Sequence, residues 1–128
     1  MTTARRLLLA VVLIAVITVI SGVVQIAAPG VVLALMSTEA TPTACHFFAL
    51  IGMFMALFGG ALLHALLARA AQPVVVLWAG LQKCGAVLGV ALGVIYAVFA
   101  PFALLVALFD LVSAVLVLKY WRQMETPA

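Results

Sequence analysis

Two ionisable residues, Lys83 and Asp110, lie inside long apolar stretches of the sequence. A charged side chain near the bilayer centre costs about 2.5–3.5 kcal/mol on insertion scales, so such residues are rare and usually face other protein. Each lies about ten residues from the presumed cytoplasmic end of its stretch, and a short turn joins the two stretches as antiparallel neighbours. The two charges therefore reach nearly the same depth, and their positions predict an ion pair between adjacent helices.

Three interpretations of these two residues stay open. The pair could fix the register of two helices and have no further role, or it could form a proton or ligand site. The third interpretation is that they do not meet, because the long stem of Lys83 can carry its charge towards the membrane surface. Asp110 is too short to reach the surface in that way.

Further polar residues are candidates for a polar cavity or for hydrogen bonds between helices. They are Thr18, Ser21, Gln25, His46, His64, Gln82 and Ser113. The first three recur at helical spacing and form a stripe, for which bonds between helices are the commoner use. The two histidines lie about 27 Å apart on one helix, and no histidine on another helix could complete a haem site. Neither a metal site nor a catalytic residue is predicted.

Small residues recur every four positions in two of the apolar stretches, and this spacing lets membrane helices approach closely. The six positions are Gly52, Ala56, Gly60, Gly85, Gly89 and Gly93. Because the two series fall on consecutive helices, we expect them to pack against each other. The alternative is that one series faces a second copy or another subunit. Lys83 and Gly85 differ by about 200° around their helix, so the lysine would look away from the glycines.

Composition places the chain in a lipid bilayer. It is 70% hydrophobic and 7% charged, whereas soluble domains are about 45–50% apolar and about 25% charged. Four stretches, at 7–28, 46–68, 74–97 and 101–120, have the length of about 20 apolar residues that a membrane helix needs. They lack the alternation of a membrane barrel. The fold predicted is all-α, a single domain over residues 1–128 with four transmembrane helices in an up-down antiparallel bundle.

The basic residues give an orientation. Arg5, Arg6, Arg69, Lys119 and Arg122 all fall on one side of the four spans, which predicts that both termini lie in the cytoplasm. Their position at the ends of apolar stretches also argues against a nucleic-acid partner. The long connection at 29–45 is expected to hold a short interfacial helix followed by a polar loop, either a plain connector or a lid.

No motif indicates an enzyme. The sequence has no phosphate-binding glycine loop, no zinc-protease motif and no CxxC pair, and no cofactor is expected. Small multidrug exporters carry a glutamate in the first span, where this chain has none. A lipid-modifying or redox enzyme therefore has no visible reacting group here.

In length, in its four spans and in the proline just after the first span, the chain resembles the uncharacterised small bacterial inner-membrane proteins of the DoxX-like type. The resemblance implies a bacterial inner-membrane helical bundle, sometimes accessory to a redox or transport system. We expect a non-enzymatic subunit or scaffold, bound to itself or to a larger membrane protein. The alternative from another class is a small transporter or channel that uses Asp110 and Lys83.

Overall fold

The computed structural model describes residues 1–36 and 39–126, and this part of the chain is helical without a β-strand. The elements are α1 (Thr3–Ala27), α2 (Pro29–Met36), α3 (Pro42–Leu67), α4 (Pro73–Ile95), the 3-10 turn η1 (Pro101–Ala103) and α5 (Leu104–Glu125). Four runs are long and apolar enough to cross a membrane: α1, α3, α4 and the segment from η1 through α5. The chain is thus a multi-pass membrane protein by length and composition.

Capping residues explain where two of the helices begin. The Thr2 hydroxyl accepts the backbone N–H of Arg5, and the Thr41 hydroxyl accepts that of Ala44. Proline takes the first position of both α3 and α4, where its missing N–H costs no hydrogen bond. These caps make α1 and α3 begin four residues earlier than predicted from the apolar stretches alone.

The predicted connection at 29–45 is therefore partly wrong. Its front half forms α2, as expected, but its last four residues are the first turn of α3. Residues 37 and 38 of the predicted polar loop lie outside the described residues. At the other end of the chain, α5 continues to Glu125, beyond the predicted end at 120, because polar residues after the apolar stretch stay helical.

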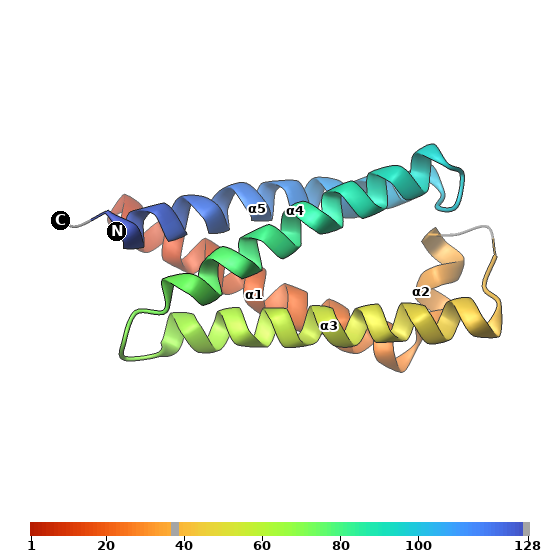
Figure 1. The fold of residues 1–128 in the computed structure, drawn as a ribbon, viewed down its shortest axis with the longest axis horizontal. Helices are drawn as coiled ribbons and strands as arrows, with labels where there is room; N and C mark the ends of the chain where they lie inside the picture. The colour runs from red at the N-terminus through yellow and green to blue at the C-terminus, as the bar shows by residue number, and fades with distance from the viewer. Residues whose placement is uncertain (37–38, 127–128) are drawn as a thin grey trace.

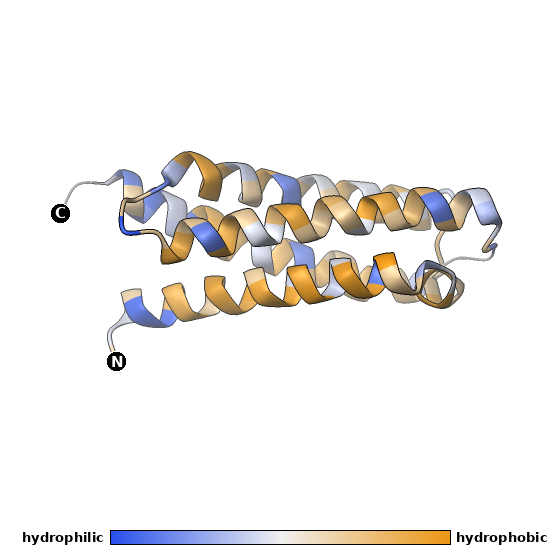
Figure 2. Cartoon of the chain, turned by 90° about the horizontal axis from the view of Figure 1, so that it is seen from below, coloured by the Kyte–Doolittle hydropathy of each residue, from blue (hydrophilic) through white to orange (hydrophobic). Residues whose placement is uncertain are grey.

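The long helices form two pairs, with α1 against α3 and α4 against α5 (Figure 1). The beginning of α1 and the end of α5 lie at one end of the molecule, and α2 lies at the opposite end. Large apolar side chains such as Leu13, Leu57, Leu88 and Leu108 are exposed on the outside of the helices. Figure 2 shows this apolar colour along all the long helices, as expected of a surface that lipid covers.

The interior contains two apolar clusters at different heights. The cluster at the terminal end includes residues from all four long helices: Leu7, Val11, Ile14, Ala15, Leu62, Ala65, Val76, Ala79 and Val117. The cluster at the α2 end is built on Leu33, Met36, Phe48 and Ala103. Along α4 and α5, Lys83 and Asp110 fall between the two clusters. A buried polar layer therefore separates the two halves of the core.

A left-handed turn ends α4 and sets the path of the link to η1. Ala97 has a φ of 56°, a region that residues other than glycine rarely adopt. The N–H of Val98 bonds to the Gly93 carbonyl at 2.8 Å, and the N–H of Ala97 bonds to the Val94 carbonyl at 3.1 Å. This pair of bonds is the Schellman motif, in which glycine usually occupies the position that Ala97 holds here.

Candidate functional site

The buried face of α4 brings Lys83 to α5. Val76, Ala79, Gly80 and Lys83 are spaced at helical intervals and are all buried. A Cβ built on Gly80 would lie 2.6 Å from the Leu118 side chain, so the absence of a side chain there lets α4 and α5 approach closely. This close approach places Lys83 opposite Asp110.

Lys83 and Asp110 form a direct ion pair. Lys83 Nζ donates to Asp110 Oδ1 at 2.8 Å, and the two residues are 3% and 4% exposed. The same Nζ lies 5.2 Å from the centroid of the Phe109 ring, a distance at which the ring face attracts a cation. A charged pair withdrawn from water offsets its desolvation cost mainly through the attraction between its two members. Each of the two buried charges is therefore stabilised by the other.

Ser113 lies one turn beyond Asp110 on the same helix. It is 1% exposed, and its hydroxyl has no hydrogen-bond partner among residues 1–36 and 39–126. Leaving a buried hydroxyl unpaired costs about 1–3 kcal/mol, so this position is unusual in a packed core. The polar layer therefore contains the Lys83–Asp110 ion pair and a hydroxyl that can still donate or accept a hydrogen bond.

The remaining polar candidates do not gather around the pair. The Gln25 side-chain amide donates to the Phe48 carbonyl at 2.8 Å and so joins α1 to α3. The Thr18 hydroxyl bonds to the Ile14 carbonyl of its own helix. Ser21 is exposed, whereas Thr18 and Gln25 are buried, so the predicted polar stripe of α1 does not lie on a single face in the protein interior.

Both histidines are exposed, and Gln82 is half-buried. His46 packs its ring edgewise against Phe47, with the ring centroids 6.1 Å apart. The described residues contain no group of three or more histidine, cysteine or acidic side chains that could hold a metal ion. Cys45 and Cys84 are free thiols.

The predicted contact between the glycine series of α3 and α4 is wrong. On α3, a Cβ at Gly52 would lie 2.8 Å from Gln25 and from the Gly22 carbonyl of α1. The neighbouring Gly59, which the fourfold spacing missed, lies against Val19 and Ala15 of α1, whereas Gly60 has open space around it. Gly52 and Gly59 therefore pack on α1, the helix with which α3 makes its most extensive contact.

The glycines of α4 divide between two roles. A Cβ at Gly93 would overlap the ring of Phe99, so Gly93 lets the following link fold back over the helix end. Gly85 and Gly89 are exposed, and a Cβ built on either would meet no atom within 4 Å among the described residues. One face of α4 thus presents two glycines, one turn apart, that the chain itself does not cover.

No protein-family model matches the chain, and no curated protein and no solved structure matches it significantly.

Proposed function

We propose that this protein is a non-enzymatic small subunit or scaffold of a membrane complex, which binds a helix of a second copy or of a larger protein through Gly85 and Gly89. In this proposal it crosses a bacterial inner membrane four times as an up-down antiparallel bundle. The basic residues near the chain ends and at Arg69 support cytoplasmic termini.

The open face of α4 carries the proposal. Elsewhere in the chain, Gly22, Gly52, Gly59 and Gly80 each lie in close contact with a neighbouring helix. In a bilayer, where lipid is as apolar as leucine, helices associate through this kind of close packing at small residues. Gly85 and Gly89 have the same spacing as such interfaces but no partner within the described residues. A helix from outside the chain would complete the pattern.

The test is a pull-down of the tagged full chain from native membranes in a mild detergent, comparing wild type with Gly89→Leu. We expect Gly89→Leu to reduce the recovered partner, or the second copy, several-fold. Gly60→Leu is the matched control, because Gly60 also has open space but lies on α3. Equal recovery with wild type and Gly89→Leu would contradict the proposal.

A second candidate function is transport or conduction through the polar layer, favoured by the unpartnered hydroxyl of Ser113 one turn from Asp110. If the pair couples to a proton or binds a solute, Asp110→Asn abolishes flux across proteoliposomes. Unchanged flux in a correctly folded Asp110→Asn variant would contradict the transport function and favour the subunit role.

A further inference from the structure

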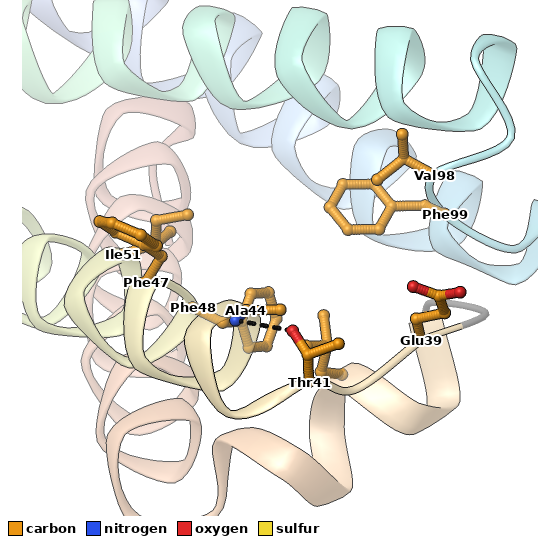
Figure 3. A pocket seen from close by; sticks show the side chains of 9 residues that line it. Glu39, Thr41, Ala44, Phe47, Phe48, Ile51, Val98 and Phe99 are labelled. Atoms are coloured by element: carbon orange, nitrogen blue, oxygen red, sulfur yellow. Dashed lines mark hydrogen bonds between the residues drawn. The ribbon is translucent and has the colours of Figure 1, made fainter.

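A pocket lies at the α2 end of the molecule, away from the ion pair. Its volume is about 410 Å³, which falls within the range of about 300–1,000 Å³ typical of small-molecule sites. Its walls come from three places: α2, the beginning of α3 with the segment before it, and the link between α4 and η1 (Figure 3). The pocket therefore joins segments that are far apart in the sequence.

The walls of the pocket are mainly apolar and aromatic. Phe47 and Ile51 lie one turn apart on α3 and are 60% and 53% exposed, so they form an uncovered strip along the helix. Phe48 is buried behind them, and Phe99 lines the pocket from the link, where it rests on Gly93. Three phenylalanine side chains thus line one pocket, and the face of such a ring attracts cations.

The pocket has an acidic residue in its lining and no lysine or arginine. Glu39 lines the pocket, and its carboxylate points towards the side where Phe99 lies (Figure 3). The sequence has no lysine or arginine between residues 7 and 68 or between 84 and 118, and these ranges contain every residue of the pocket. His46, which precedes Phe47 on α3, is exposed and does not line the pocket. The pocket therefore combines a negative charge with aromatic rings.

We propose that this pocket binds an amphiphile with a positively charged ammonium head and an apolar tail. The head lies beside Glu39 and the phenylalanine rings, and the tail follows Phe47 and Ile51 along α3. The carboxylate of Glu39 attracts the head through its negative charge, and this attraction needs no hydrogen bond. The arrangement also matches the bilayer, because the polar residues precede α3 and the apolar strip runs along the helix.

Charge selectivity distinguishes this site from a groove that merely contacts lipid tails. An ordinary lipid groove accepts an alkyl chain whatever its head group. Here an anionic head would lie beside Glu39, where like charges repel, and no basic side chain of the pocket would compensate. A cationic amphiphile and an anionic one with the same tail should therefore bind very differently.

The experiment measures binding of radiolabelled dodecyltrimethylammonium to the full chain in nanodiscs of digalactosyldiacylglycerol, a bilayer lipid without an ammonium group or a net charge, with empty nanodiscs as the background. We expect saturable binding that unlabelled dodecyltrimethylammonium displaces. Radiolabelled dodecyl sulfate, which has the same tail, is measured in a separate experiment below the concentration that unfolds the chain, and it should show no saturable binding. Glu39→Gln should weaken binding about fivefold, since a partly exposed charge pair contributes on the order of 1 kcal/mol. Glu125→Gln, the control at the terminal end, should leave it unchanged.

The aromatic wall is tested in the same assay with a matched pair of substitutions. Phe47→Ala should weaken binding, whereas Phe54→Ala should not, because Phe54 is similarly exposed on α3 but lies outside the pocket. The proposal is overturned if wild type shows no saturable binding of the cation, if radiolabelled dodecyl sulfate binds as tightly as the cation, or if Glu39→Gln binds like wild type. Because Glu39 and Phe47 are exposed, neither substitution should prevent folding.

Discussion

Gly22 of α1 lies directly against Gly52 of α3, and a Cβ built on Gly22 would lie 2.5 Å from the Gly52 carbonyl oxygen and 2.6 Å from the Ala56 nitrogen. Both obstacles are backbone atoms, which cannot turn aside as a flexible side chain can. The pairing of the first two long helices therefore depends on the absence of a side chain at Gly22, and a methyl group there would force the helices apart.

Gly22→Ala should consequently lower the free energy of unfolding by about 1–3 kcal/mol, the usual cost of overpacking a close contact. The measurement is unfolding in dodecyl maltoside micelles by titration with dodecyl sulfate, followed by tryptophan fluorescence. Gly85→Ala is the control, because a Cβ at Gly85 meets open space. If the two variants lose the same stability, the close approach of α1 and α3 is not what limits substitution at Gly22.

The ion pair predicts a non-additive series of substitutions. Lys83→Leu or Asp110→Leu alone leaves one buried charge without its partner and should destabilise the protein by about 3–5 kcal/mol. The double substitution removes both charges and should recover most of that loss, because apolar replacements of buried pairs are often neutral. A double-mutant cycle of unfolding free energies measures the coupling. Purely additive losses would show that the two charges do not depend on each other.

The sequence was enough to predict four spans and a common depth for Lys83 and Asp110. Span length follows from bilayer thickness, and depth follows from the fixed rise of a helix. Both rules depend on counting along the chain and need no knowledge of which helix faces pack together. The structure has the two side chains in contact at 2.8 Å.

The packing of the glycines could not be predicted in the same way. In a helix that is apolar all round, periodicity does not mark an inner face, because lipid and core are both apolar. A spacing of four residues is also the same whether the partner helix is inside or outside the chain. Hence Gly85 and Gly89, which looked like a contact with α3, lie on an open face, while Gly59 and Gly80 make close contacts that the spacing did not indicate.

The pocket escaped prediction for a different reason. Its wall at Phe99 depends on the left-handed turn at Ala97, and an alanine gives no sequence signal for that conformation. A glycine at the same position would have indicated a helix end. The sequence prediction instead counts the first two residues of this link, Tyr96 and Ala97, in the third span, whose predicted end at residue 97 lies two residues beyond the observed end at Ile95.

The hydrogen bond from Gln25 to the Phe48 carbonyl predicts a moderate effect of substitution. Gln25→Leu keeps the size of the side chain but removes the bond between α1 and α3. Because polar bonds between membrane helices average about 0.6 kcal/mol and reach about 1.7, the loss should fall in that range. The unfolding titration described above measures it. Ser21→Ala, on the exposed side of α1, should cost less than Gln25→Leu.

Ala97→Gly should stabilise the protein slightly. The left-handed conformation costs an alanine about 1–2 kcal/mol, and glycine avoids this cost while losing about 0.5–1 kcal/mol of backbone entropy on folding. The net gain expected in the unfolding titration therefore lies between zero and about 1.5 kcal/mol. Ala100→Gly is the matched control, because Ala100 has an ordinary φ of −63° and gains no relief. If both variants are destabilised equally, the turn at Ala97 carries no strain that glycine could remove.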